Sequence, residues 1–181
     1  MNWNRISIIG GPGTGKTTLS NELSKIYNIP AIHIDGIHHL ENWQIRDKNE
    51  RDKMILDIVE QEKWIIDGTY KDTLKTRLEK SDLVIWLDYP TCMLLKGVIN
   101  RWIKGRGKER EEIPGCKERL NFKFLIYVSK YNKEKRKFIV DNIKGINPNK
   151  VIIFKKQRDL NKWLKEQKER NINGKTNSTI L

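Results

Sequence analysis

The sequence contains few cysteines and no long apolar segment. Of its 181 residues only two are cysteines, Cys92 and Cys116, and they stand far apart. They form no CxxC pair, which disfavours a zinc site or a disulfide-rich secreted fold and favours reduced thiols in a reducing compartment. Every apolar run is much shorter than the roughly 18 residues that a membrane-spanning helix requires. We therefore expect a chain without membrane spans or structural disulfides.

The first residues lack the features of a secretory signal. The segment MNWNRISIIGG has only a short apolar stretch before two glycines and no small-residue cleavage site. Together with the reduced cysteines, this start predicts a cytoplasmic protein.

Acidic residues are scarce in the second half of the chain, and the formal net charge is +13. Residues 1–90 contain 12 Lys and Arg and 14 Asp and Glu, whereas residues 91–181 contain 24 Lys and Arg and 9 Asp and Glu. A basic surface attracts polyanions, either phosphate-rich small molecules or nucleic acid, and charge alone does not separate the two. A solvated lysine-rich surface is the alternative.

Apolar runs alternate with segments of helical periodicity. Nearly continuous apolar strands are buried on both faces, as in parallel sheets covered by helices, so the pattern predicts an α/β fold. We expect one domain over residues 1–169 and a flexible tail over 170–181, with residues 35–46 as a loop. The predicted strands are 5–9, 31–34, 63–67, 83–88 and 150–154, and the predicted helices are 17–27, 47–62, 91–104, 120–143 and 159–169.

The most specific motif is GGPGTGKTT. It fits the P-loop pattern G-x-x-x-x-G-K-[ST], with a predicted strand before it and a helix after it. Glycines let backbone N–H groups surround an anion, and the helix N-terminus adds partial positive charge. Lys16 would reach the β- and γ-phosphates of ATP, and the Thr17 hydroxyl would ligate Mg²⁺. A plain glycine-rich turn is the alternative. The predicted nucleotide-binding residues are Gly10, Gly11, Pro12, Gly13, Thr14, Gly15, Lys16, Thr17 and Thr18.

Other motifs narrow the class of nucleotide-binding protein. A regulatory GTPase needs an Asn-Lys-x-Asp motif, and the Asn-Lys pairs at 132–135 and 161–164 both lack the final aspartate. The segment WIIDG at 64–68, which contains one acidic residue, follows the P-loop sooner than the acidic residue would in a motor or AAA-type ATPase. This short spacing predicts a small kinase.

Several segments resemble the adenylate-kinase-like P-loop kinases, and within them the group called DNA topology modulation proteins. The segments are GGPGTGKTT, AIHIDGIHHLENW, WIIDGTY, DLVIWLDYP, INRWIKGRGKEREE and GCKERL, and the resemblance extends over residues 5–165. It implies a three-layer P-loop NTPase fold with five parallel strands in the order 2-3-1-4-5 and helices on both faces. It also implies an acceptor-binding insertion near residues 35–62 and a short lid near 105–120.

The resemblance assigns roles to two aspartates. Asp67 matches the acidic residue that holds a Mg²⁺-bound water, where a carboxylate facing the P-loop opposes the charge of the metal. Asp35 stands where small-molecule kinases of this fold carry an aspartate that orients or deprotonates an acceptor hydroxyl. A nucleoside monophosphate acceptor would require Thr or Ser with a nearby Arg, so Asp35 departs from the adenylate kinase pattern. Stabilisation of a turn is the alternative for both aspartates.

The segment after Asp35 is expected to line the acceptor side. His38, Trp43 and Arg46 are the predicted acceptor-binding residues, and Trp43 offers a stacking surface or, alternatively, ordinary packing. A zinc site at the histidines is disfavoured, because only one carboxylate lies between them and no cysteine joins them.

Arginines after the fourth predicted strand resemble the lid of this kinase class. Arg106, Arg110 and Arg119 would stabilise the charge that spreads over the transferred phosphoryl group while the closed lid excludes water. The adjacent Glu111 and Glu112 would orient them. Solvated surface arginines are the alternative.

Two functional hypotheses follow. The first is an ATP-dependent phosphotransferase with a small-molecule acceptor, which uses Mg²⁺ held through Thr17 and Asp67, with Arg158 stacked on the adenine. The second is a nucleotide-binding regulator that contacts DNA or RNA through the basic half, although residues 91–181 contain no helix-turn-helix, zinc finger or RNA-binding motif. The catalytic residues predicted by the first hypothesis are Lys16, Asp35, Arg106, Arg110 and Arg119.

Overall fold

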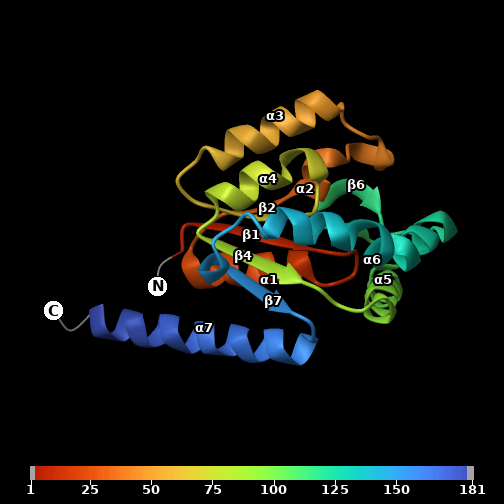
Figure 1. The fold of residues 1–181 in the computed structure, drawn as a ribbon. Helices are drawn as coiled ribbons and strands as arrows, with labels where there is room; N and C mark the ends of the chain where they lie inside the picture. Colours follow the sequence, from red (N-terminus) through yellow and green to blue (C-terminus); the bar gives the residue numbers. More distant parts are fainter. Residues whose placement is uncertain (1–2, 179–181) are drawn as a thin grey trace.

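The computed structural model describes the backbone of residues 3–178 and the side chains of residues 3–172. Its centre is a parallel five-stranded sheet (Figure 1). The strands are β1 (Arg5–Gly10), β2 (Ala31–His33), β3 (Trp64–Asp67), β4 (Leu83–Leu87) and β7 (Val151–Phe154), and their order is β2-β3-β1-β4-β7. This confirms the expected α/β fold and strand order. The fifth strand of the sheet is β7, because β5 (Glu109–Arg110) and β6 (Ile113–Lys117) form a separate antiparallel pair earlier in the chain.

The central strands are buried on both faces, as their continuous apolar runs predict. Ile6 of β1 is in register with Ile65 of β3 on one side and with Leu83 of β4 on the other. All three side chains are at most 1% exposed. Burying each of them contributes roughly 1.5–3 kcal/mol, which gives the sheet a rigid centre.

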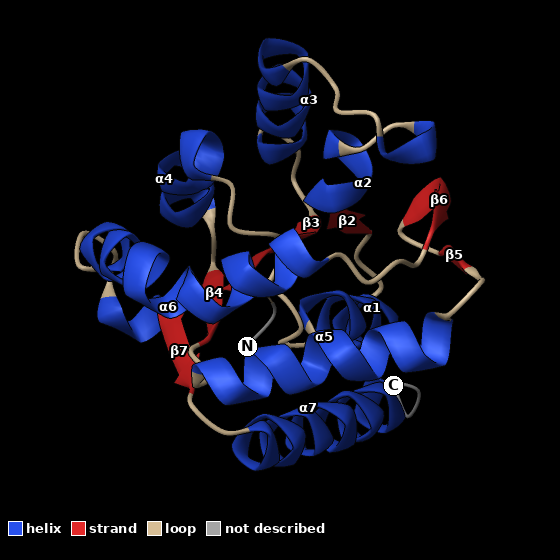
Figure 2. Cartoon of the chain, turned by 90° about the vertical axis from the view of Figure 1, so that its right-hand side faces the viewer, coloured by secondary structure: helices blue, strands red, loops and turns tan. Residues whose placement is uncertain are grey.

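Helices cover both faces of the sheet, so the chain has three layers (Figures 1 and 2). Helices α3, α4 and the C-terminal half of α6 pack on one face, and α1 and α7 pack on the other. The helices are α1 (Lys16–Tyr27), α2 (Ile34–His38), α3 (Lys48–Val59), α4 (Lys71–Lys80), α5 (Thr91–Gly105), α6 (Phe122–Ile143) and α7 (Gln157–Ser178), with short 3₁₀ helices η1 (Glu41–Trp43) and η2 (Pro148–Lys150).

Helix α1 begins directly after the P-loop glycines. Gly15 precedes it with a left-handed backbone, at φ 86°, which a residue without a side chain adopts at low cost. The helix ends at Tyr27, because Asn28 is also left-handed and its N–H bonds back to the Ser24 carbonyl, and Pro30 follows. Lys16 is therefore the first residue of a rigid helix.

Two local expectations were wrong, and one helix was not predicted. Residues 35–46 are not a plain loop, since they contain part of α2 and all of η1. Residues 71–80 form α4, a helix that the sequence interpretation left without assignment. Helix α7 continues to Ser178, well beyond the predicted end at residue 169. The predicted flexible tail lies partly at 179–181, outside the described residues.

The carboxyl ends of the parallel strands lie at one edge of the sheet. The P-loop follows β1, Asp35 follows β2, and Asp67 is the last residue of β3. Ligands of open α/β sheets bind at this edge, so the fold gathers the predicted site residues there. Within residues 3–178, no helix combines the length and the apolar character needed to cross a membrane.

Candidate active site

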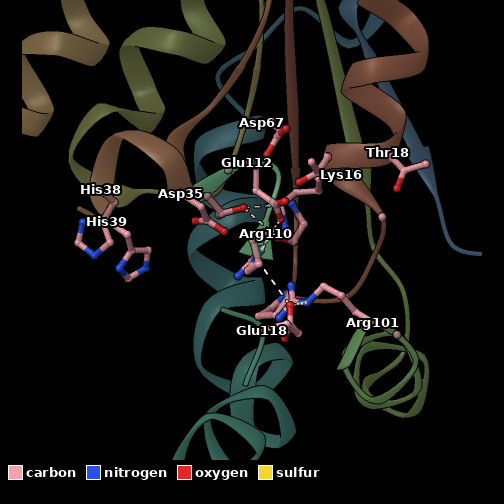
Figure 3. Close-up of a pocket in the computed structure, with 18 of the residues that line it drawn as sticks. Lys16, Thr18, Asp35, His38, His39, Asp67, Arg101, Arg110, Glu112 and Glu118 are labelled. Atoms are coloured by element: carbon pink, nitrogen blue, oxygen red, sulfur yellow. Dashed lines mark hydrogen bonds and ion pairs between the residues drawn. The ribbon is translucent and has the colours of Figure 1, made fainter. Parts of the chain in front are cut away.

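A cavity of about 1220 Å³ lies at this edge of the sheet. Its walls come from the P-loop, α2, the loop after β3, the end of α5, the β5–β6 pair and the first half of α6. In the view of Figure 3, Glu112 lies between Asp35 and Lys16, with Asp67 above it and Arg110 below it. The predicted site residues that line the cavity are Gly10, Pro12, Gly13, Gly15, Lys16, Thr17, Thr18, Asp35, His38, Trp43, Asp67, Arg110 and Arg119.

The P-loop is held from beneath by buried neighbours. A Cβ at Gly13 would lie 2.5 Å from the Leu94 carbonyl oxygen, so the backbone approaches α5 as closely as glycine allows. Gly11 packs against the side chains of Leu94 and Tyr131, and the buried Thr14 hydroxyl donates to the Gly11 carbonyl at 2.8 Å. Gly11 and Thr14 therefore support the loop and do not line the cavity.

Lys16 folds back over this loop. Its Nζ donates to the Gly11 carbonyl oxygen at 2.9 Å. Burial lowers the pKa of Lys16 from its ordinary value, against the opposing charges of Asp35 and Asp67. The ammonium group thus stands between two carboxylates and the glycine loop, where an anion would give it a stronger partner than a carbonyl.

Asp67 is held by two side chains, one from α1 and one from β2. Its Oδ2 accepts a hydrogen bond from the Ser20 hydroxyl at 2.7 Å and lies 2.5 Å from His33 Nδ1. Burial alone would lower the pKa of His33, but the hydrogen bond and charge of Asp67 outweigh it and raise that pKa. Both contacts use Oδ2, and within the described residues Oδ1 has no hydrogen-bond partner. The carboxylate can therefore present Oδ1 to the cavity.

Asp35 is fixed by Tyr70, from the loop after β3. The Tyr70 hydroxyl donates to Asp35 Oδ1 at 2.9 Å. Burial alone would raise the pKa of Asp35, but Lys16, this hydrogen bond and Arg110 outweigh it and hold the pKa below its ordinary value. Asp35 is therefore an anion at neutral pH, oriented by a neutral phenol whose own pKa is raised by burial and by Asp35.

A buried arginine supports the loop that carries Tyr70. Arg77 of α4 is fully buried and donates to the carbonyl oxygens of Gly68 at 3.0 Å and Tyr70 at 3.4 Å. Burial lowers the pKa of Arg77 to about 10, partly offset by the charge of Asp67. Removing one partner of a buried charged hydrogen bond is costly, so this arginine holds the loop in one conformation.

Aromatic rings form the wall next to Asp35. The ring centroids of His38 and Tyr70 lie 5.2 Å apart, those of His38 and His39 lie 4.6 Å apart, and those of His39 and Trp43 lie 5.2 Å apart. Burial lowers the pKa of both histidines below the ordinary value, so both imidazoles are neutral at neutral pH. This wall therefore consists of uncharged aromatic rings, and the imidazole nitrogens are among its polar atoms.

Opposite this wall lies a group of paired charges. Arg110 Nε lies 3.1 Å from Glu112 Oε1 and 3.7 Å from Glu118 Oε2, and Arg101 Nε lies 3.1 Å from the same Glu118 oxygen. The Arg110 and Glu118 side chains are only 8% and 4% exposed. Burial alone would raise the pKa of Glu112, but Arg110 outweighs it and lowers that pKa. The arginines are thus held in place by carboxylates that an incoming phosphate group could replace.

Three predicted residues lie away from the cavity. Arg46 pairs with Glu50 and donates to the Ile37 carbonyl, and it does not line the cavity. Arg106 lies over the ring of Trp102, at 5.5 Å, and the Arg158 side chain is 85% exposed beside Asp159.

Sequence reasoning missed four supporting residues: Tyr70, Arg77, His33 as a partner of Asp67, and Glu118. Tyr70 ends the WIIDGTY segment and could have been noticed there. His33 and Glu118 also lie within segments that carry the family resemblance, AIHIDGIHHLENW and GCKERL, but nothing in those segments indicates which partners they contact. Arg77 contacts the site only through the fold.

Comparison with known proteins supports the same fold. Residues 5–94 match the family described as AAA domain. No curated protein matches the chain significantly. Among solved structures, shikimate kinase from Bacteroides thetaiotaomicron is 15% identical with a TM-score of 0.59 over 92% of this chain and 97% of that one. Shikimate kinase from Aquifex aeolicus is 17% identical with a TM-score of 0.54 over 95% and 98%. The chain therefore has the fold of P-loop kinases.

Proposed function

We propose that the protein is an ATP-dependent phosphotransferase that acts on the hydroxyl group of a small molecule. The observation that carries this proposal is the convergence of Lys16, Asp35 and Arg110 on one cavity beside a glycine-rich anion cradle. A cavity of about 1220 Å³ exceeds the roughly 300–1,000 Å³ of a pocket for one small ligand, which leaves room for ATP and an acceptor. The fold shared with shikimate kinases supports the same conclusion.

On the donor side, the P-loop backbone and Lys16 would bind the phosphates of ATP. The backbone N–H groups after β1 and the start of α1 favour an anion, and Lys16 would exchange the Gly11 carbonyl for phosphate oxygens. The groups that could hold a metal ion are the Thr17 hydroxyl and the Asp67 carboxylate. Two protein ligands suit Mg²⁺, because this ion keeps several waters and phosphate oxygens as its other ligands. Bound there, Mg²⁺ would neutralise charge on the phosphates.

On the acceptor side, Asp35 would orient the reacting hydroxyl. The acceptor oxygen forms a bond to the γ-phosphorus, the bond from that phosphorus to the β,γ-bridging oxygen breaks, and ADP leaves. The hydroxyl proton passes to the Asp35 carboxylate, whose Oδ1 is held by Tyr70. His38 and Trp43 would line the acceptor.

The lid arginines would stabilise the transferred group. Arg110 and Arg119 line the cavity, and planar guanidinium groups suit the oxygens of a phosphoryl group in transfer. Arg101, which shares Glu118 with Arg110, would act with them. Arg106 and Arg158 do not line the cavity, so neither has a role in the proposed transfer.

The test is phosphorylation of a panel of hydroxyl compounds with radiolabelled ATP. Lys16→Ala should lower turnover at least about 100-fold, because a preorganised charge at the phosphates is lost. Lys75→Ala is the matched control and should keep the wild-type rate. Lys75 is exposed on α4, and within the described residues its one ion pair is with Glu79. Unchanged turnover in Lys16→Ala would reject the proposal.

A further inference from the structure

Two segments far apart in the sequence meet above the cavity. We call residues 38–46 the acceptor loop and residues 106–119 the lid. The backbone N–H of Trp43 donates to Cys116 Sγ at 3.2 Å, and the Cys116 thiol donates to the Leu40 carbonyl at 3.3 Å. The indole Nε1–H of Trp43 donates to the Lys117 carbonyl at 3.2 Å. The acceptor loop is thus hydrogen-bonded to β6 of the lid.

The Trp43 ring also contacts two lid arginines. The guanidinium carbon of Arg119 lies 4.8 Å from the ring centroid, and that of Arg110 lies 5.7 Å from it. Both distances are within the range of cation–π attraction. The ring therefore packs against two arginines while it also lines the cavity. Arg119 forms no salt bridge within the described residues, so the indole is its main partner.

The backbone of the acceptor loop is strained at this contact. Asn42 and Trp43 have φ of 57° and 63°, in the left-handed region. This conformation is unusual for a bulky side chain and persists only where surrounding contacts maintain it. Some of those contacts lie within the loop, such as the Leu40 N–H to the Gln44 carbonyl at 2.8 Å. Apart from the edge-to-face contact of its ring with His39, the contacts of Trp43 itself come from the lid.

We propose that Trp43 is a positioning residue that docks the lid on the acceptor loop and holds Arg110 and Arg119 over the cavity. Its backbone N–H and its indole N–H have hydrogen-bond acceptors only when the lid is in place, so the acceptor loop and the lid arginines take their working positions together. The benefit to catalysis rests on the proposed phosphotransfer, whereas the docking of the lid does not.

Limited digestion with trypsin measures the docking directly. The lid contains cleavage sites such as Lys108 and Lys117, and cleavage of a transiently opened segment follows the population of its open form. Trp43→Leu removes the ring contacts and the indole hydrogen bond, and should speed cleavage within the lid about tenfold, as followed by mass spectrometry. Trp43→Phe keeps a ring face for the arginines and should give an intermediate rate.

Trp102→Leu is the matched control. Trp102 of α5 is also partly buried and also has an arginine over its ring, namely Arg106 at the start of the lid. Within the described residues, neither Trp102 nor Arg106 has a hydrogen bond, ion pair or ring contact with the acceptor loop. The lid of the Trp102→Leu variant should be cleaved at the wild-type rate. Thermal unfolding of all variants separates opening of the lid from global instability, because only local opening leaves Tm near that of the Trp102 control.

Steady-state kinetics test the link to catalysis, with the acceptor found in the screen. Trp43→Leu should lower kcat about tenfold with little change in KM for ATP. It should lower kcat by a smaller factor in an Arg119→Ala background, because one of the contacts that it removes is already absent there. Wild-type lid cleavage in Trp43→Leu overturns the inference. A different outcome is faster lid cleavage in Trp43→Leu than in the wild type, together with no phosphorylation of any acceptor by the wild type. That result would reject the proposed function and leave the docking role intact.

Discussion

The two sides of the cavity are held in place by different kinds of contact. The P-loop rests on the buried core, where Gly13 touches α5 and Gly11 touches Leu94 and Tyr131. The acceptor loop rests on the lid through Trp43 and the buried Cys116, and both segments lie outside the central sheet. Close packing in a core leaves no room to move, whereas two segments outside the sheet can separate without unfolding the domain. We therefore expect the proposed donor side to be preformed and the proposed acceptor side to be able to open.

The largest effect is expected from adding a methyl group beneath the P-loop. A Cβ at Gly97 of α5 would lie 2.0 Å from the Gly13 carbonyl oxygen. Gly97→Ala should destabilise the protein by about 2–4 kcal/mol and abolish ATP binding, because neither backbone can yield. Thermal unfolding and calorimetric titration with MgATP measure both.

Gly145→Ala is its control, because a Cβ there would meet its nearest neighbour at 3.9 Å. That variant should bind ATP normally. ATP binding by Gly97→Ala at wild-type affinity would show that the donor side is less rigid than the contacts indicate.

A smaller effect is expected where the lid meets the acceptor loop. Gly115 and Gly107 are lid glycines with φ of 74° and 77°. A Cβ at Gly115 would lie 2.8 Å from Glu41 Cγ, whereas a Cβ at Gly107 would meet nothing within 4 Å. Both alanine variants bear the same backbone strain of about 1 kcal/mol, but only Gly115→Ala should push the lid away.

Trypsin cleavage of the lid distinguishes these two variants. We expect faster cleavage in Gly115→Ala than in Gly107→Ala, with similar ATP affinity in both. Equal cleavage rates would mean that the contact with Glu41 does not hold the lid.

The smallest effect is a difference in pH dependence between the two sides. Asp67 raises the pKa of His33 on the donor side, whereas burial lowers the pKa of His39 on the acceptor side. The stabilisation from His33 is complete below its unfolded pKa of roughly 6.5 and is lost as pH rises through the folded value. His33→Gln should therefore lower the free energy of unfolding more at pH 5.5 than at pH 8.5.

His39→Gln should behave in the opposite way. Protonating His39 costs stability as pH falls below its unfolded pKa, so the variant should gain stability relative to the wild type in acid. Urea unfolding at the two pH values measures both. The same pH trend in both variants would contradict the assigned directions.

The donor side was predictable because its residues are contiguous. The P-loop pattern lies within nine residues, between a strand and a helix that periodicity also indicates, and Asp67 ends a clearly apolar strand. The acceptor side was predictable only in part. Asp35 and His38 line the cavity as expected, but Arg46 and Arg106 do not, because ion pairs and rings nearby offer them other partners.

By itself, the sequence determined the parallel sheet and the anion cradle, because local periodicity and glycine placement dictate them. The strand order came only from the family resemblance. Only the tertiary structure decided which side chains support the site. The Tyr70 hydroxyl on Asp35, His33 on Asp67 and the Trp43 ring against the lid arginines each join segments distant in the chain. Such contacts depend on how helices and strands pack in space, and no spacing along the chain encodes them.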